Sequence, residues 1–171
     1  MIAEMIPEIK IDIREPLASE SAELANASFA AWEKGVGPHV SAATREGISE
    51  LDFADFIREN PDQILAAFVN DALPSVPVGY VATENGDNYI SDLWVDPTYE
   101  GKGIGTALLQ AMTNRIRARR FGTITIEVLT ANNRALGLYQ HLGYVTLWQG
   151  LRPDGHLRER VEKTGMVKTL T

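Results

Sequence analysis

Three glycines at alternate positions open an amphipathic predicted helix, and this feature constrains the chain more than any other. They lie in the segment Glu100-Gly101-Lys102-Gly103-Ile104-Gly105-Thr106, after a predicted strand that ends at Val95. Each glycine inside a helix costs about 1 kcal/mol relative to alanine, so a gain elsewhere has to compensate. A ligand can lie against backbone without Cβ atoms, and the free N–H groups of the first helical turn suit an anion such as pyrophosphate. A tight strand-to-helix connection without a ligand is the alternative, and we favour phosphate binding.

The spacing of these glycines disfavours the two commonest phosphate-binding motifs. A Walker A loop requires a glycine where this chain has Asp96, and it requires Ser or Thr after Lys102, where this chain has another glycine. A dinucleotide-binding fingerprint counted from Gly101 places its third glycine at Thr106, and counted from the next glycine it places it at Leu108. ATP, GTP, NAD and FAD are therefore disfavoured.

Hydrophobic periodicity along the rest of the chain predicts one mixed α/β domain. The predicted strands are Ile9–Arg14, Ile64–Val69, Val76–Thr83, Tyr89–Val95, Thr123–Leu129, Tyr144–Leu151 and a last segment that ends in Met166-Val167-Lys168. The predicted helices are Ser19–Glu33, a stretch within Thr44–Arg58, Ile104 to about Arg119, and Asn132–Leu142. Turns are predicted at Asn70-Asp71, Leu73-Pro74-Ser75, Asn85-Gly86-Asp87 and Pro153-Asp154-Gly155. The order predicts a mostly antiparallel sheet with a parallel strand–helix–strand centre.

Composition and charge exclude several other classes of protein. The 171 residues suit a single domain, 1–171, and the absence of cysteine excludes disulfides, thiolate metal sites and cysteine nucleophiles. The 23 acidic and 16 basic residues give a formal charge of −7, which opposes binding to nucleic acid or an anionic membrane. The segment Met1–Lys10 carries Glu4 and Glu8, unlike a signal peptide, and no apolar run approaches the roughly 18 residues of a membrane span. We expect a cytoplasmic protein without nucleic-acid or membrane partners and, because its three histidines are scattered, without a metal site.

Two segments together resemble motifs of the GNAT superfamily, the Gcn5-related N-acetyltransferases. The family's pyrophosphate loop is Gln/Arg-x-x-Gly-x-Gly/Ala after a strand that ends in Val-x-Pro, and this chain has Val95-Asp96-Pro97 followed by Glu100-x-x-Gly103-x-Gly105. Only Glu100 departs from the pattern, and we expect Lys102 to offset its charge. The segment from Asn132 to Tyr144 is similar to the family's N-x-x-A-x-x-x-Y-x-x-x-G-F/Y signature. The resemblance implies the GNAT fold, with six to seven strands, about four helices and central parallel strands that splay apart.

The resemblance also implies that acetyl-CoA is the cosubstrate and that its pantetheine arm lies between the splayed strands. Backbone groups of Leu93, Trp94 and Val95 would then hold the arm and polarise the thioester carbonyl. The loop residues would hold the pyrophosphate: Glu100, Gly101, Lys102, Gly103, Ile104, Gly105 and Thr106. Asn132 and Ala135 would contact the arm from the start of the next helix.

Tyr139 matches the family's general acid, whose hydroxyl protonates the departing thiolate. Its position alone predicts a core tyrosine, because it shares the apolar stripe of its helix with Ala135 and Leu142. The motif favours the catalytic role over the core role.

Asp92 and Glu127 interrupt apolar strands and are the candidate bases for deprotonating the amine. Alternation places Asp92 on a face with Ile90 and Trp94, and it places Glu127 on a face with Thr125 and Leu129. The resemblance relates Glu127 to the base of ribosomal-protein N-terminal acetyltransferases and Asp92 to an acidic position of polyamine-type members. Each carboxylate could instead be paired with a cation or a backbone donor, and a water chain could carry the proton.

The sequence thus predicts transfer of the acetyl group of acetyl-CoA to a primary amine of a small molecule or peptide, directly and in a ternary complex. One alternative is a catalytically silent acyl-CoA-binding module, which Glu100 favours slightly. Another is an acyltransferase that uses a different donor, such as succinyl- or malonyl-CoA. Trp32 and the loop Gly35–His39 lie where the family places substrate-gating elements, but they do not identify the acceptor. Family members are often dimers through their C-terminal strands, and we expect that a homodimer can form here.

Overall fold

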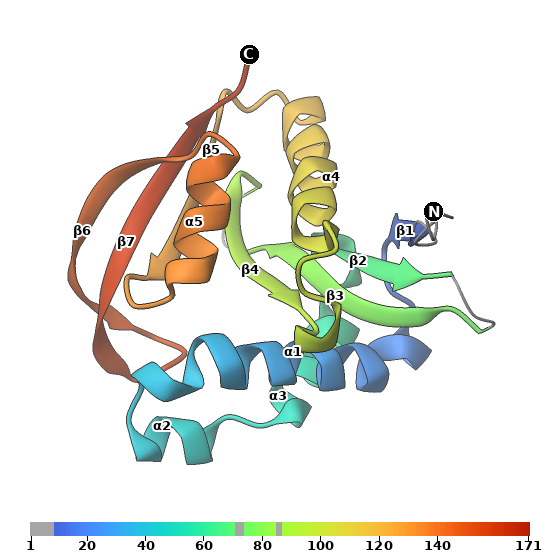
Figure 1. Cartoon of the computed structure of the whole chain (residues 1–171), viewed down its shortest axis with the longest axis horizontal. Coiled ribbons are helices and arrows are strands. Elements are labelled where there is room, and N and C mark those ends of the chain that lie inside the picture. Colours follow the sequence, from blue (N-terminus) through green and yellow to red (C-terminus); the bar gives the residue numbers. More distant parts are fainter. Residues whose placement is uncertain (1–8, 71–73, 85–86) are drawn as a thin grey trace, which may run out of the picture.

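The computed structural model describes residues 9–70, 74–84 and 87–171, and one seven-stranded sheet organises them (Figure 1). The strands are β1 Ile11–Arg14, β2 Ile64–Val69, β3 Val76–Thr83, β4 Tyr89–Val95, β5 Thr123–Leu129, β6 Val145–Asp154 and β7 Glu159–Thr169. Their order in the sheet is β1-β2-β3-β4-β5-β7-β6, and β4–β5 is the parallel pair among antiparallel neighbours. This mixed, mostly antiparallel sheet confirms the predicted fold class.

Helices cover both faces of the sheet and divide the core into two clusters (Figure 1). The α-helices are α1 Ser21–Gly35, α2 Ala42–Gly47, α3 Glu50–Glu59, α4 Ile104–Ala118 and α5 Asn133–His141. One cluster packs α4 and α5 against one face through residues such as Leu108 and Met112. The other packs α1 and α3 against the opposite face through Leu24, Trp32 and Ile57. Different helices therefore cover the two faces of the sheet.

The central strands β4 and β5 pair over only a short length. Their register pairs are Tyr89 with Thr125 and Ile90 with Ile126, and both strands continue beyond these residues without pairing to each other. The unpaired ends leave backbone donors and acceptors facing a gap in the middle of the sheet. This geometry confirms the predicted splay of the central strands.

A β-bulge at Ser91 changes which side chains of β4 share a face. Ala82 of β3 lies opposite Asp92, but the next residue, Thr83, lies opposite Ile90, so Ser91 is the extra residue. Ile90 consequently packs in the cluster under α4, whereas Trp94 packs in the cluster under α1 and α3. The prediction that Asp92 shares a face with Ile90 was wrong, because a bulge shifts strand alternation by one residue.

Element boundaries differ from the predicted ones at two places. The predicted helical stretch within Thr44–Arg58 is two helices, α2 and α3, because the chain is extended at Ile48 and the N–H of Ser49 donates to the carboxylate of Asp52 (2.8 Å). β6 continues through Pro153 and Asp154, the first two residues of the predicted turn, and the turn is formed by residues 155–158. The predicted turn residues 71, 73, 85 and 86 lie outside the described residues, as do Met1 to Glu8 of the N-terminal segment.

The helices of the described segments are all too short or too polar to cross a membrane. The last strand in the sheet order, β6, exposes Val145, Leu147 and Leu151. The expected homodimer through the C-terminal strands stays a prediction.

Candidate functional site

The N-terminus of α4 is an open set of backbone donors. Gly101 (φ 75°) and Gly103 (φ 81°) both have left-handed backbone, which glycine adopts without the penalty that other residues incur. No atom lies within 4 Å of the Cβ position at either glycine. Gly103 is the N-cap residue, and no side chain caps the helix there. The first-turn N–H groups are therefore free to bind an anion.

The third glycine of the loop, Gly105, has a packing role. A Cβ atom at this position would lie 3.3 Å from Cδ2 of Leu138 and 3.8 Å from Cγ2 of Val95. Glycine thus lets the first turn of α4 approach α5 and the end of β4 closely. This contact fixes the anion-binding turn relative to both elements that border the splay.

Glu100, the residue that departs from the family pattern, is held by two cations from other elements. Its carboxylate lies 2.7 Å from the amine of Lys34 on α1 and 3.3 Å from the guanidinium of Arg134 on α5. The amine of Lys102, which was expected to offset this charge, lies over the ring of Tyr99 at 5.4 Å from its centroid. The negative charge beside the loop is thus compensated by α1 and α5.

A cavity of about 1030 Å³ passes through the splay between β4 and β5. On the side of α5 its lining includes Asn132, Ala135 and Tyr139, and in the splay it includes Leu93, Trp94, Ile126 and Val128. On the opposite side it is bounded by α1 to α3 and by the β6–β7 hairpin. A cavity of this size is in the range of cofactor and substrate sites. One cavity therefore brings together seven of the predicted site residues: Asp92, Leu93, Trp94, Glu127, Asn132, Ala135 and Tyr139. Val95 and the predicted loop residues 100–106 lie outside its lining.

Tyr139 lies on α5 and borders this cavity although its side chain is only 5% exposed. Burial raises the pKa of Tyr139 above its usual value, and the nearby Tyr144 and Asp92 add to the rise. Among the described residues the Tyr139 hydroxyl makes no side-chain hydrogen bond. A protonated hydroxyl without a protein partner is available as a proton donor to a ligand.

Asn132 caps α5 and connects it to α1. Its side-chain oxygen accepts the N–H of Ala135 (3.3 Å), and its amide nitrogen would lie 3.1 Å from a Cβ atom at Gly35. Glycine at the end of α1 thus allows α5 to approach. Asn132 holds the start of α5 in place and also borders the cavity.

Asp92 is a cavity carboxylate without a Lys or Arg partner among the described residues. It accepts hydrogen bonds from the indole N–H of Trp94 (3.1 Å) and from the hydroxyl of Ser91 (2.8 Å). Burial raises the pKa of Asp92, these two hydrogen bonds oppose the rise, and the charge of Glu84 adds to it. A carboxylate with a raised pKa is a stronger base, so Asp92 is suited to accept a proton.

Glu127 borders the same cavity but is ion-paired. Its carboxylate lies 2.9 Å from the amine of Lys163 on β7, and the same amine lies 2.9 Å from the carboxylate of Asp154 on β6. Hydrogen bonds from the N–H of Leu157 and from Lys163 lower the pKa of Asp154 despite its burial. Lys163 thus ties Glu127 to the β6–β7 hairpin, which makes Glu127 less suited than Asp92 to act as a base.

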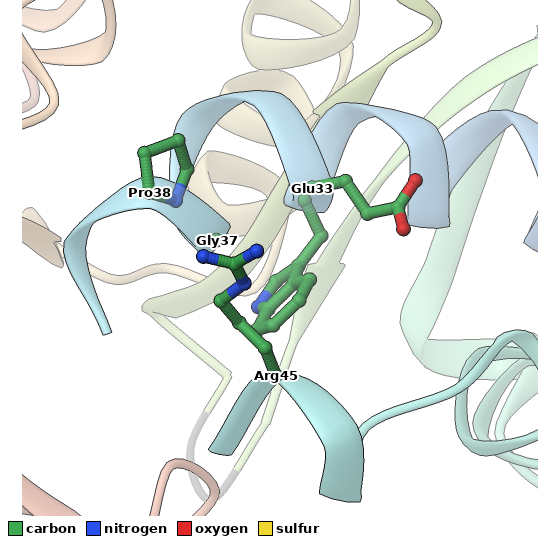
Figure 2. Close-up of a pocket in the computed structure, with 5 residues that line it drawn as sticks. Glu33, Gly37, Pro38 and Arg45 are labelled. Atoms are coloured by element: carbon green, nitrogen blue, oxygen red, sulfur yellow. The ribbon is translucent and has the colours of Figure 1, made fainter. Parts of the chain in front are cut away.

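The aromatic and loop residues beside α1 form the outer wall of the cavity. Trp32 and Val36 border it from α1 and its C-terminal end, and Phe53 packs edge-on against Trp94 with ring centroids 6.0 Å apart. Figure 2 shows a smaller pocket of about 190 Å³ nearby, where Arg45 of α2 reaches toward Gly37. Trp32 borders both spaces. Of the predicted gating loop, Val36 borders the large cavity, and Gly37 and Pro38 border the smaller pocket.

Sequence reasoning missed Lys163, Glu84 and His156, all of which border the cavity. Lys163 lies 36 positions after its partner Glu127, and His156 belongs to the turn that was placed too early. The only sequence feature that pointed to any of them was the charged Lys163 in the last predicted strand segment. That feature does not show which carboxylate Lys163 pairs with.

Three comparisons relate this chain to known proteins. Residues 24–144 match the family model described as the acetyltransferase (GNAT) family. An acetyltransferase from Pectobacterium atrosepticum is 30% identical over 98 residues, which are 57% of this chain and 68% of that protein. Two solved structures cover most of the chain. A GCN5-related N-acetyltransferase from Rhodopseudomonas palustris is 25% identical, with a TM-score of 0.72 over 93% of this chain and 95% of that one. The PaiA N-acetyltransferase from Thermoplasma acidophilum, in complex with coenzyme A, is 17% identical, with a TM-score of 0.71 over 94% and 99% of the two chains.

Proposed function

Because the chain belongs to the acetyltransferase (GNAT) family, we propose that it transfers the acetyl group of acetyl-CoA to a primary amine of a small molecule or peptide. The main support for this proposal is one continuous cavity at the splay between β4 and β5. Tyr139 borders it from one side of the sheet and Asp92 from the other. Transfer is direct, in a ternary complex, and the chain has no cysteine that could form an acyl-enzyme.

The residues around the splay fit acetyl-CoA. The uncapped first turn of α4, with Gly101 and Gly103 in left-handed backbone, offers donors for the pyrophosphate. The unpaired ends of β4 and β5 offer backbone groups that can bind an extended arm as a strand would. When bound, acetyl-CoA supplies a thioester carbonyl for attack and a thiolate leaving group. Backbone groups of Leu93, Trp94 and Val95 hold the arm and polarise the carbonyl.

Tyr139 acts as the general acid in this proposal. Its hydroxyl borders the cavity from α5 and is protonated at neutral pH, as tyrosine ordinarily is, and burial raises its pKa further. Its role is to give a proton to the sulfur as the C–S bond breaks, so that CoA leaves as a neutral thiol.

Asp92 acts as the general base. It lies on the face opposite α5, so it can take the proton of the amine while Tyr139 protonates the leaving group from the other side. The hydrogen bonds from Trp94 and Ser91 hold its carboxylate in one orientation. A water molecule that relays the proton from the amine to Asp92 is compatible with the same geometry.

A silent acyl-CoA-binding module is the weaker alternative. Glu100 favoured that interpretation because its charge would oppose a phosphate, but Lys34 and Arg134 compensate this charge. An acyltransferase with another acyl-CoA donor would use the same residues.

The experiment that tests the proposed function measures free thiol while acetyl-CoA is incubated with a panel of polyamines, small amines, amino acids and peptide N-termini. Amine-dependent thiol release, with an acetylated product identified by mass, is the expected result. Tight CoA binding without turnover of any acceptor would support the silent module instead. The same panel run with succinyl- and malonyl-CoA identifies the donor.

A further inference from the structure

The acceptor side of the cavity carries more carboxylates than cations. Its acidic lining residues are Asp52, Glu84, Asp92, Glu127, Asp154 and Glu159. The fully charged basic residues of the same lining are Arg158, exposed in the β6–β7 turn, and Lys163. An acidic cavity favours cationic ligands and repels anionic ones.

Four of the six carboxylates are already occupied by protein donors. Lys163 binds both Glu127 and Asp154 at 2.9 Å. Glu159 accepts the N–H of Ser41 (3.0 Å), and Asp52 accepts the N–H of Ser49 (2.8 Å). This leaves two carboxylates, Glu84 and Asp92, without a Lys, Arg or backbone N–H partner among the described residues.

Glu84 and Asp92 lie at a spacing that one small molecule can bridge. Ala82 pairs with Asp92, and Glu84 follows Ala82 by two residues, which is about 7 Å along a strand. Both side chains border the cavity, and the charge of Glu84 helps to raise the pKa of Asp92. The imidazole of His156 lies 3.6 Å from Glu84, but it is largely exposed and neutralises the carboxylate only when protonated. The wall therefore presents two negative charges at different depths.

Aromatic rings line the cavity next to Asp92, on the side of Asp92 that lies away from Glu84. Tyr80 and Trp94 face each other across β3 and β4, and both border the cavity. Phe53 packs against Trp94 and Phe56 packs against Tyr80, with ring centroids 6.0 and 6.4 Å apart. Aromatic faces attract ammonium groups, so these rings favour a cationic nitrogen at Asp92.

We propose that the acceptor is an amine with a second ammonium group, whose reacting nitrogen lies at Asp92 beside the aromatic rings and whose distal ammonium is bound by Glu84. This inference rests on the proposed acetyl transfer, because that reaction assigns Asp92 to the reacting nitrogen. An acceptor with a carboxylate in place of the second ammonium would meet Glu84 as a like charge and is disfavoured.

Three acceptors with the same five-carbon chain test this preference: cadaverine, pentylamine and δ-aminovaleric acid. They share the reacting amine and differ only in the far end, which is an ammonium, a methyl group or a carboxylate. We expect kcat/KM to be about tenfold higher for cadaverine than for pentylamine, and lowest for δ-aminovaleric acid. The preference should shrink as salt is added, because the distal ion pair is partly exposed.

Glu84→Gln tests whether this carboxylate binds the second ammonium group of the acceptor. It should raise KM for cadaverine about tenfold, with little change in kcat, and leave KM for pentylamine unchanged. Glu162→Gln, which removes an exposed carboxylate of β7 outside the cavity lining, is the matched control and should change neither value. If the Glu84 variant were misfolded, KM would rise for both amines, which distinguishes misfolding from a specific loss of cadaverine binding.

The outcomes separate this inference from the proposed function. Amine-dependent thiol release with equal kcat/KM for cadaverine and pentylamine, or with preference for δ-aminovaleric acid, overturns the inference and leaves acetyl transfer intact. If no amine is turned over, acetyl transfer fails. Calorimetric titration of cadaverine and pentylamine into the CoA-saturated protein then decides the inference without turnover: tighter binding of cadaverine, lost in Glu84→Gln, supports it, and equal affinity overturns it.

Discussion

The proposed site has two halves, one formed mainly by backbone groups and the other mainly by side chains. The proposed cofactor half uses backbone: the unpaired ends of β4 and β5, the capped start of α5, and the first turn of α4, which lies outside the cavity lining. The acceptor half uses side chains from α1 to α3, β3, β4 and the β6–β7 hairpin. Backbone groups can bind the same cofactor in any sequence that adopts the fold, whereas side chains select one acceptor. Substitutions should therefore act differently in the two halves.

Tyr139→Phe, at the boundary of the two halves, should have the largest effect. Loss of the general acid should lower kcat by about 10²–10⁴-fold while CoA affinity is retained, measured by thiol release and calorimetry. Tyr144→Phe is the matched control, because its ring packs 5.7 Å from that of Tyr139 and its buried hydroxyl has no hydrogen-bond partner among the described residues. An unchanged rate in Tyr139→Phe would remove this residue from the acid role.

Gly103→Ala should weaken the cofactor half. A left-handed backbone costs a residue with a Cβ atom roughly 1–2 kcal/mol, so the N-terminus of α4 should shift and the Kd for CoA should rise about tenfold. Gly137→Ala is the control, and it should stabilise the protein, whereas Gly103→Ala should destabilise the start of α4. Gly137 is exposed inside α5 with open space at its Cβ position, so alanine should stabilise the fold by about 0.4–1 kcal/mol. Calorimetry and thermal unfolding measure both effects.

Lys163→Met should disturb the acceptor half and spare the cofactor half. It leaves the carboxylates of Glu127 and Asp154 facing each other without a cation, and should cost about 1–3 kcal/mol of unfolding free energy at neutral pH. Because the pKa of Asp154 is lowered in the folded state, its contribution is present above the usual aspartate pKa and is lost as pH falls through the folded value. Urea unfolding at neutral and acidic pH should show the difference from wild type shrinking in acid. A difference that stays constant with pH would contradict the ion-pair explanation.

Glu100→Gln should have the smallest effect. Its ion pairs with Lys34 and Arg134 are partly exposed, and such pairs contribute about 0–1 kcal/mol. Removal of the charge also frees two cations near the loop, so the Kd for CoA should change by less than about fivefold and in the direction of tighter binding. Substantially weaker CoA binding would mean that Glu100 itself positions the loop.

Hydrophobic periodicity predicts most of the fold because each face of the sheet buries a regular stripe. It fails where a local interaction overrides the pattern. The bulge at Ser91 leaves no mark on the alternation, and the helix break at Ile48 lies between two stretches that both have helical spacing. Pro153 predicted a turn, but proline is tolerated in a strand at the edge of a sheet, where β6 lies.

The two halves of the candidate site also differ in how far the sequence predicts them. The glycine loop and Asn132–Tyr144 are local motifs, so the sequence alone predicts the cofactor half. The acceptor half depends on contacts between distant segments, such as Lys163 with Glu127 and His156 with Glu84. Such pairs follow from strand register, which a single sequence does not determine. The sequence left Asp92 and Glu127 as equal candidates, and the ion pair of Glu127 with Lys163 is the observation on which we base the proposed choice of Asp92.

The pH dependence of kcat/KM in Asp92→Asn and Glu127→Gln, measured beside wild type, tests the central claim most directly. Asp92→Asn should lower kcat/KM by about a hundredfold and remove the acidic limb, which in wild type lies above the usual aspartate pKa of about 3.9 because burial raises the pKa of Asp92. Glu127→Gln should retain that limb and lose less than about tenfold in rate. Loss of the acidic limb in Glu127→Gln, with a near-normal profile in Asp92→Asn, would contradict the account.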